Sequence, residues 1–333
     1  MLGLRFLGQG RLALEPFPDP QPQGDEVVVR IEAAAICGTD REHYLGAGQP
    51  TIPGHESAGQ VVAVDKPSWV KVGQRVAINC HVTCGCCRHC LNGDLYFCEQ
   101  LSVIGFDRHG GFAEYARVPE ACCMPLPDHL SYTAGALLTD MFGTAYRAVV
   151  RSGLLPGDRV GVWGAGPIGL AAMLVIKAMG GRAALIDLNA YRLDLALRLG
   201  ADVVINPSQL DVVSALADWT HGEGLDIAYE CVGHQACLDQ ALEAVKKRGV
   251  VVLVGVSHRV TIDPWQYFIG RELTMYGTRN FNARQFQAMV KLLSSGLPAE
   301  QIVTHRFALS DAEQAFSVFS SAQCGKVVFT ASG

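Results

Sequence analysis

Four cysteines of this 333-residue chain are spaced as Cys84-x2-Cys87-x2-Cys90-x7-Cys98. Four thiolates at this spacing suit tetrahedral Zn²⁺, and such a site is structural because no coordination position is left for a substrate. Cys86 is a fifth sulfur that tetrahedral coordination cannot use. The alternative, a loop of free thiols, would be exposed to oxidation. The spacing therefore predicts a structural zinc lobe over residues 80–100.

A second group of potential metal ligands is dispersed along the first third of the chain. Cys37-Gly-Thr39-Asp40 follows a run rich in Val, and Gly-His55-Glu56 lies in the next turn region. Single Cys and His residues are more often structural than ligands. Spacing alone therefore leaves two interpretations open here, a catalytic metal site and an ordinary core role.

The third chemical feature is a glycine-rich turn, Gly164-Ala-Gly166-Pro167-Ile168-Gly169. In the GxGxxG pattern the first glycine allows the tight turn, the second lets the backbone approach a pyrophosphate, and the third lets helix and strand pack closely. The helix that begins at this turn supplies free N–H groups to the phosphates. The pattern predicts a dinucleotide site; the alternative is an ordinary strand-to-helix turn.

Cofactor preference depends on two residues beyond that turn. Asp187 ends the next expected strand, where its carboxylate would accept hydrogen bonds from the ribose hydroxyls and repel a 2′-phosphate. Arg192 follows closely and can itself accept a phosphate. We expect NAD rather than NADP, with Arg192 as the residue that argues for NADP.

The elements that must position these residues fall into two kinds. The first part is expected to be β-rich, with strands at 26–34, 59–64 and 75–78, because short Val/Ile-rich runs alternate with Gly, Pro and Asp turns. From about Asp158, strands at 159–163, 183–187, 203–205, 225–230 and 250–254 alternate with helices at 167–179, 190–199, 208–219 and 234–247. This alternation predicts a parallel sheet covered by helices on both faces. A last helix, 311–321, with Ser310 as its cap candidate, leads to a terminal strand at 326–330.

Composition narrows the functional classes. The net charge of −5 gives no electrostatic reason to expect nucleic acid or an anionic membrane as a partner. The N-terminal sixteen residues lack the features of a signal or transit peptide, and the most apolar stretch, 168–179, contains Lys177 and is too short to span a bilayer. We expect a soluble cytoplasmic protein.

Taken together and in this order, the Cys37 motif, the His55 motif, the four-cysteine lobe and GxGxxG resemble the zinc-containing medium-chain dehydrogenase/reductase family over essentially the whole chain. The resemblance implies an α/β chain in which a mainly-β, GroES-like catalytic domain (1–142 and 280–333) receives a Rossmann NAD-binding domain (143–279) as an insertion. It also implies a homo-oligomer, a tetramer or a dimer, with the tetramer favoured.

The resemblance assigns a catalytic zinc to Cys37 and His55, with Glu56 as a residue that can swing onto the metal. Asp140, in Leu138-Thr-Asp140-Met-Phe-Gly, matches the third ligand in one branch of the family; a helix cap is the alternative role. Asp40 matches the carboxylate that orients the zinc-bound imidazole.

The proton route and the cofactor contacts are also carried over from the family. Thr39 matches the relay hydroxyl, whereas the outer relay is left open between Glu42, His43 and neither. Val232 in Glu230-Cys-Val-Gly is expected near the nicotinamide, and Arg279 near a cofactor phosphate or substrate hydroxyls, or else in a surface salt bridge.

The implied activity is reversible hydride transfer from a secondary alcohol to NAD, with two zinc ions per chain. A polyol, sugar acid or related hydroxy compound is the expected substrate, with a simple alcohol, an aldehyde or threonine as alternatives. Two other classes compete with this activity: a zinc-free quinone or enoyl reductase of the same superfamily, and a cofactor-binding scaffold without turnover. Both are disfavoured because the metal-ligand set, the relay hydroxyl and the glycine motif are all present.

Overall fold

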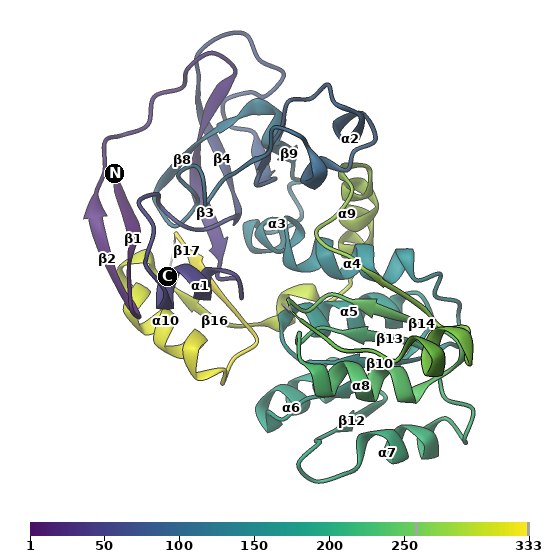
Figure 1. The fold of residues 1–333 in the computed structure, drawn as a ribbon. Coiled ribbons are helices and arrows are strands. Elements are labelled where there is room, and N and C mark those ends of the chain that lie inside the picture. The colour runs from purple at the N-terminus through teal and green to yellow at the C-terminus, as the bar shows by residue number, and fades with distance from the viewer. Residues whose placement is uncertain (257–258, 332–333) are drawn as a thin grey trace. The chain divides into compact units, whose positions relative to one another are not determined.

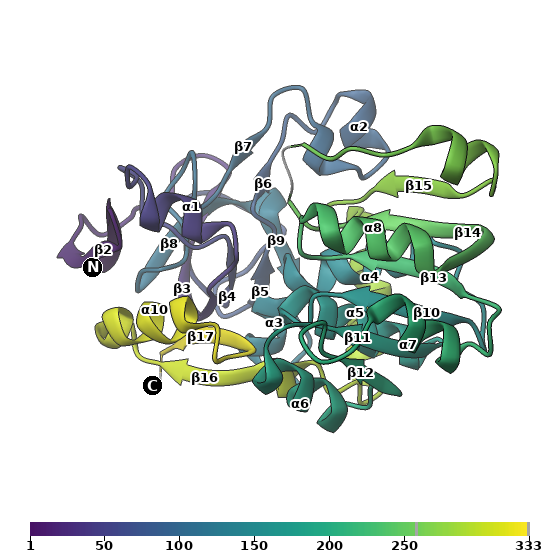
Figure 2. The ribbon, with the colours of Figure 1, turned by 60° about the horizontal axis from the view of Figure 1, so that its bottom comes forward.

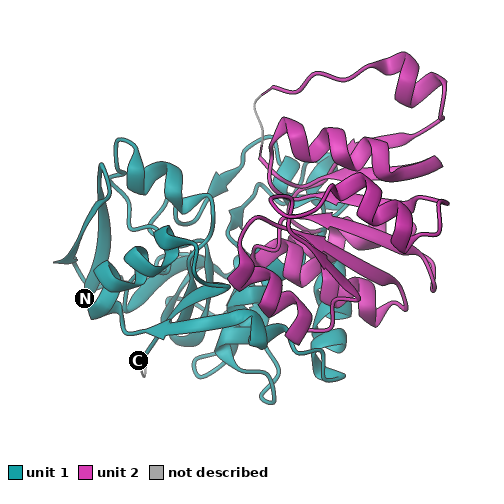
Figure 3. Cartoon of the chain, turned by 90° about the horizontal axis from the view of Figure 1, so that it is seen from below, with its two compact units in different colours: residues 1–143, 282–333 teal, residues 144–281 magenta. Residues whose placement is uncertain are grey.

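The computed structural model describes residues 1–256 and 259–331 and divides the chain into two compact units. Unit 1 consists of Met1–Gly143 and Asn282–Gly333, and unit 2 of Thr144–Phe281 (Figure 3). The boundaries expected from the sequence were 142/143 and 279/280. Among the described residues, no helix combines the length and apolar character that crossing a membrane requires.

Unit 1 is built on a mixed sheet with the order β16-β17-β3-β4-β5-β9, and β8 pairs with β3 beside β17 (Figure 1). Its remaining strands form two small ribbons, β1-β2 and β6-β7. The strands are β1 (Leu2–Gly8), β2 (Arg11–Pro16), β3 (Glu26–Ala35), β4 (Glu56–Val64), β5 (Arg75–Ile78), β6 (His81–Val82), β7 (Ser102–Val103), β8 (Tyr115–Pro119), β9 (Cys123–Pro125), β16 (Val303–Phe307) and β17 (Lys326–Thr330).

The described residues of unit 1 contain five α-helices. The apolar residues of its sheet pack into one core with residues of the first and the last of these helices. Phe112 and Phe329 meet edge to face at 5.1 Å in this core, and Phe6 meets Phe316 at 5.2 Å. The helices are α1 (Asp40–Leu45), α2 (Arg88–Leu91), α3 (Tyr132–Leu138), α9 (Phe286–Ser294) and α10 (Ala312–Ser321). Helix α4 (Met141–Arg151) begins in unit 1 and continues in unit 2.

Unit 2 is a six-stranded parallel sheet with the order β12-β11-β10-β13-β14-β15 (Figure 2). In chain order this is 3-2-1-4-5-6, the Rossmann arrangement, whose direction of winding reverses between β10 and β13. The strands are β10 (Arg159–Trp163), β11 (Arg182–Ile186), β12 (Val203–Ile205), β13 (Leu225–Glu230), β14 (Val245–Leu253) and β15 (Thr274–Gly277). The helices are α5 (Pro167–Ala178), α6 (Ala190–Arg198), α7 (Val212–Trp219) and α8 (Gln235–Ala244).

Four expected element boundaries are wrong by three residues or more. The strand expected from Gly59 begins at Glu56, where the chain pairs with Ala35. The helix expected from Ser208 begins at Val212, because the Asp211 side chain caps it by accepting from Ser214 N. The helix expected to reach Lys247 ends at Ala244, and β14 already begins at Val245, where the chain pairs with Leu225.

The cap candidate of the last helix is also wrong. Ser310 lies in a short 3₁₀ turn (Leu309–Asp311) that precedes α10, and Asp311 occupies the cap position without a side-chain cap bond. The Ser310 hydroxyl instead donates to Asp311 Oδ1 at 3.5 Å.

Candidate functional site

The dispersed ligand candidates converge because of how β3 and β4 pair. The two strands are antiparallel, with Ala35 opposite Glu56, so the end of β3 meets the start of β4. Cys37 lies just after β3, and His55 lies just before β4. Asp140 reaches the same place from the turn between α3 and α4.

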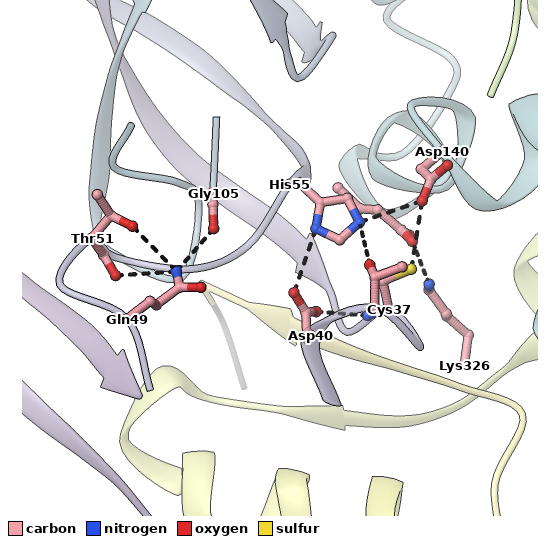
Figure 4. Close-up of polar contacts among 10 residues, drawn as sticks. Cys37, Asp40, Gln49, Thr51, His55, Gly105, Asp140 and Lys326 are labelled. Atoms are coloured by element: carbon pink, nitrogen blue, oxygen red, sulfur yellow. Dashed lines mark hydrogen bonds and ion pairs between the residues drawn. The ribbon is translucent and has the colours of Figure 1, made fainter. Parts of the chain in front are cut away.

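One ligand atom from each of Cys37, His55, Glu56 and Asp140 lies within 4.8 Å of the others (Figure 4). Asp140 Oδ2 is 3.5 Å from Cys37 Sγ and 3.3 Å from His55 Nε2. Cys37, His55 and Glu56 are buried, whereas the Asp140 side chain is 16% exposed. The set therefore combines a sulfur, an imidazole nitrogen and two carboxylates around one point that is not fully enclosed.

Asp40 determines how the imidazole is held. Its Oδ1 is 3.4 Å from His55 Nδ1, and its Oδ2 accepts a hydrogen bond from Cys37 N at 2.8 Å. The side chain is 1% exposed. Asp40 thus faces Nδ1, although the two atoms form no hydrogen bond in this geometry, while Nε2 faces Asp140. A carboxylate on this side of the imidazole is the partner that fixes the tautomer of a metal-binding histidine.

Glu56 has a buried partner that no sequence pattern indicated. Lys326 Nζ, from the first residue of β17, donates to Glu56 Oε1 at 2.7 Å, and both side chains are at most 3% exposed. Glu56 Oε2 is buried without a hydrogen-bond partner among the described residues. One oxygen of this carboxylate is therefore neutralised by Lys326, and the other remains to be satisfied.

The electrostatics of the set favour protonated ligands in the absence of a cation. Burial, together with the neighbouring carboxylates Glu56 and Asp140, raises the pKa of the Cys37 thiol above its ordinary value. Burial alone would lower the pKa of His55, but attraction from Asp40 and Cys37 raises it well above its ordinary value. A cation that displaces these protons would be bound in their place.

This donor set fits a zinc ion. Thiolate, imidazole and carboxylate are the ligands zinc takes in catalytic sites, and Glu56, whose Oε2 is buried without a hydrogen bond among the described residues, is one of the four donors. The donors also lie close enough together, since Zn–N and Zn–O bonds of about 2.0–2.2 Å require donor atoms within a few ångströms of one another.

Of the residues expected to move a proton, Thr39 is the one that contacts His55 directly. Thr39 Oγ1 is 3.4 Å from His55 Nε2 and its residue is exposed, so this hydroxyl connects the ligand set with solvent. The His43 ring lies 5.4 Å from Phe106, whose ring lies 4.9 Å from that of His55. Glu42 is exposed on α1. Phe106 thus contacts the rings of both His43 and His55.

The four-cysteine lobe forms a second donor cluster in unit 1. Its Sγ–Sγ distances are 3.5 Å for Cys87–Cys90, 3.6 Å for Cys84–Cys98 and 3.9 Å for Cys84–Cys90. A zinc tetrahedron with Zn–S bonds of about 2.3 Å has edges of about 3.8 Å, so the four sulfurs fit it. Cys86 is exposed and outside the cluster.

Backbone groups prepare this cluster for a cation. N–H groups of Cys86 and Cys87 lower the pKa of Cys84 to about 6, whereas burial raises the pKa of Cys90 to about 12. The N–H groups of Cys84 and Gln100 also point at Cys98 Sγ, at 3.3 and 3.4 Å. These contacts stabilise thiolates, the form in which cysteine binds zinc.

In unit 2 the glycine motif joins β10 to α5. Gly164 has φ +98°, a conformation that favours glycine, and a Cβ on Gly169 would lie 1.8 Å from Gly164 O. Gly166 is the N-cap of α5, with Pro167 and Ile168 in its first turn. The twelve-residue helix therefore presents its N-terminus at the turn, as a pyrophosphate site requires.

Three of the four remaining cofactor candidates lie near that turn. Asp187 accepts from Ala165 N at 2.7 Å and from Asn189 N at 2.8 Å, so the carboxylate is fixed at the end of β11. Arg192 Nη1 lies 3.7 Å from where a Cβ on Gly166 would be. Val232 is exposed and lies close to Gly164, and Arg279 is exposed after β15.

Two site-forming residues were missed by sequence reasoning. Lys326 gives no local signal, because its partner is 270 positions away. Glu230 was noted only as part of a short motif, yet its buried carboxylate accepts from Val232 N and Gly233 N at 2.9 and 2.8 Å and closes the turn after β13. A buried acidic residue at a strand end is a signal that could have identified it.

Comparisons with known proteins agree with this geometry. The family models "Alcohol dehydrogenase GroES-like domain" and "Zinc-binding dehydrogenase" match residues 23–128 and 167–295. The chain is 34% identical over 329 residues to an L-threonine 3-dehydrogenase of Chromobacterium violaceum, covering 95% of each chain.

Two solved structures are similar over 99% of both chains. One is 2R,3R-butanediol dehydrogenase from Bacillus subtilis, with a TM-score of 0.90 and 30% identity. The other is an alcohol dehydrogenase from Escherichia coli CFT073 complexed with NADH, with a TM-score of 0.91 and 30% identity. With a GroES-like unit, a Rossmann unit and relatives of this similarity along its length, the chain belongs to the zinc-containing medium-chain dehydrogenase/reductase family.

Proposed function

We propose that the protein is a zinc-dependent dehydrogenase that oxidises a secondary alcohol reversibly with NAD as hydride acceptor. The observation that carries the proposal is the convergence of Cys37, His55, Glu56 and Asp140 within 4.8 Å. Cys84, Cys87, Cys90 and Cys98 would hold a second, structural zinc ion.

The chain's own residues would prepare the alcohol for oxidation. Zinc, when bound, supplies a Lewis acid that lowers the pKa of an alcohol. Cys37, His55 and Asp140 would hold the ion, and Asp40 would keep a proton on His55 Nδ1 so that Nε2 stays free to bind. Thr39 Oγ1, exposed and 3.4 Å from the imidazole, would accept the alcohol proton and pass it to solvent.

NAD is the proposed cofactor because of Asp187 at the end of β11. Its carboxylate, fixed by two backbone N–H groups, would accept from the ribose hydroxyls and repel a 2′-phosphate. The N-terminus of α5, with Gly164, Gly166, Pro167, Ile168 and Gly169, would bind the pyrophosphate. Arg192 and Arg279 are the candidates for further phosphate contacts, and Val232 for a nicotinamide contact. A similar protein solved with NADH supports the preference.

For the substrate we propose a secondary alcohol with a polar group on the neighbouring carbon, such as a polyol or a hydroxy acid. The similarity to a butanediol dehydrogenase supports a hydroxyl as that group. Threonine, with an amino group there, is the second candidate, supported by the L-threonine 3-dehydrogenases among the relatives. We also expect a homo-oligomer, to be measured by light scattering.

Initial rates of NADH formation on matched substrates test this proposal. The panel contains vicinal diols, polyols, sugar acids, L-threonine and simple secondary alcohols, each with NAD and with NADP. Activity on a diol, polyol, sugar acid or threonine supports the proposal, and activity on simple alcohols alone rejects the substrate class. The control is Cys37→Ala, which should abolish turnover while calorimetry still detects NAD binding; retained turnover would contradict the metal site.

A further inference from the structure

The buried pair of Glu56 and Lys326 joins the metal-ligand set to the last strand of unit 1. Lys326 Nζ is 2.7 Å from Glu56 Oε1, with side-chain exposures of 3% and 0%. An ion pair without solvent is costly to form, since both charges lose their hydration. This pair contacts the metal-ligand set through Glu56, so it can affect both the charge and the coordination of that set.

Charge supplies the first part of the explanation. The site carries four negative charges when Cys37, Glu56, Asp140 and the adjacent Asp40 are all deprotonated. A divalent ion supplies two positive charges and so neutralises half of them. Lys326 adds a buried positive charge in direct contact with this group (Figure 4). The ion pair therefore reduces the excess negative charge that would otherwise be buried around the ion.

Coordination geometry supplies the second part. Cys37, His55, Glu56 and Asp140 together would fill the four positions of tetrahedral zinc and leave none for a substrate. The Glu56 carboxylate has two competing roles, because it offers one oxygen to the ligand set while its Oε1 is bonded to Lys326. Its buried Oε2 has no hydrogen-bond partner among the described residues. An interaction that keeps Glu56 from binding the ion therefore leaves one of the four coordination positions of zinc open.

We propose that Lys326 is a positioning residue that restrains Glu56 from becoming a permanent metal ligand and so keeps one position available to the alcohol. This inference rests on the proposed metal site of Cys37, His55 and Asp140. Without Lys326, the Glu56 carboxylate loses its counter-charge, and the ion becomes its best available partner. The open position would then be occupied by the protein's own side chain.

A purely structural pair that ties β17 to β4 would behave differently. Its loss would lower stability but would leave the coordination of the ion unchanged. Cobalt(II) at the catalytic site, with zinc kept at the four-cysteine site, reports coordination by its visible spectrum, and metal analysis verifies the loading. Imidazole, titrated without NAD or substrate, is the probe for the open position.

In K326M we expect imidazole to bind at least tenfold more weakly than in the wild type, with a changed cobalt spectrum. K326R retains the positive charge and should restore both wild-type readouts. The double variant K326M/E56Q should regain imidazole affinity, because a neutral amide is a poor ligand for the ion. Unchanged affinity and spectrum in K326M would overturn the proposal.

If K326M does not fold, imidazole binding to the single variant E56Q tests the proposal. Removing the competing carboxylate should leave imidazole binding at least as tight as in the wild type, and weaker binding would overturn the inference. Failure of the proposed function is separable: wild-type protein without a thiolate-to-cobalt absorption band would have no Cys37 metal site at all. A band in the wild type with no response in K326M rejects only the role of Lys326.

Discussion

Replacing Asp40 with asparagine would test whether this buried carboxylate sets the protonation of His55. The substitution preserves shape, and the amide oxygen can still accept from Cys37 N, which is 2.8 Å from the present Oδ2. The amide NH₂ would then face His55 Nδ1, now 3.4 Å from Oδ1. An NH₂ donor there favours the tautomer that carries its proton on Nε2, the nitrogen directed at the metal ligands.

The size of the effect follows from that tautomer change. Losing the carboxylate partner of a metal-binding histidine typically weakens metal affinity by about 10- to 100-fold, or about 1.4–2.7 kcal/mol. We expect Asp40→Asn to weaken the affinity for the catalytic ion by an amount in this range. The four-cysteine site, which has its own ligands, should be unaffected.

The assay is a competition titration of apo-protein with zinc against a chelating indicator, resolving the two sites. Asp65→Asn is the matched control, since Asp65 also accepts one backbone N–H, from Gly24 at 2.8 Å, but is exposed and outside the ligand set. Wild-type zinc affinity in Asp40→Asn would refute the tautomer argument. Equal weakening in Asp65→Asn would show that the effect is not specific to the site.

Three further predictions concern the rest of the chain. Cys98→Ser should remove one of the two expected zinc ions and lower the melting temperature, as elemental analysis and calorimetry would show; full zinc content would contradict the lobe. Asp187→Ser should weaken NAD binding about tenfold and reduce the preference over NADP, because a serine cannot replace both carboxylate oxygens; an unchanged ratio of kcat/KM for the two cofactors would count against it. Asp202→Asn should cost about 1 kcal/mol of unfolding free energy at pH 7, a modest figure because solvent screens the pair. Burial opposes ionisation of Asp202, but hydrogen bonds from Lys177 and Ala183 N outweigh it and lower its pKa. This stabilisation is therefore present above the pKa of Asp202 in the unfolded state and is lost as pH falls through its pKa in the folded state. Denaturant titrations should show the difference in unfolding free energy between wild type and Asp202→Asn disappearing below about pH 4.

Local patterns predicted the Rossmann unit well, because its strands are buried apolar runs and its glycine turn has a fixed chemistry. Strands 159–163, 203–205 and 225–230 have the expected bounds. Element ends were harder, since the start of α7 depends on Asp211 as a cap and the end of α8 on the early pairing of Val245. Where a helix begins or ends thus depends on contacts made in the folded chain, and local sequence patterns alone do not specify it.

The candidate active site was only partly predictable from local sequence. Cys37 and His55 were candidates on their own chemistry, but their meeting depends on the pairing of Ala35 with Glu56, which no local pattern specifies. Asp140 was assigned only by family resemblance. Lys326 could not be found at all, because a lysine at the start of an apolar strand is ordinary unless its distant carboxylate is known.

The pairing of residues 270 positions apart has a consequence for biosynthesis. At about 5–20 residues per second, a ribosome needs roughly 15–55 s to add Lys326 after Glu56. Throughout that interval β3 lacks its neighbour β17, and Glu56 lacks the cation of Lys326. The six strands of the Rossmann unit are all made within the same interval, before β17 appears. An unpaired strand edge invites wrong partners, so residues 33–35 of β3, whose edge away from β4 only β17 covers, would gain from protection by chaperones until β17 is made.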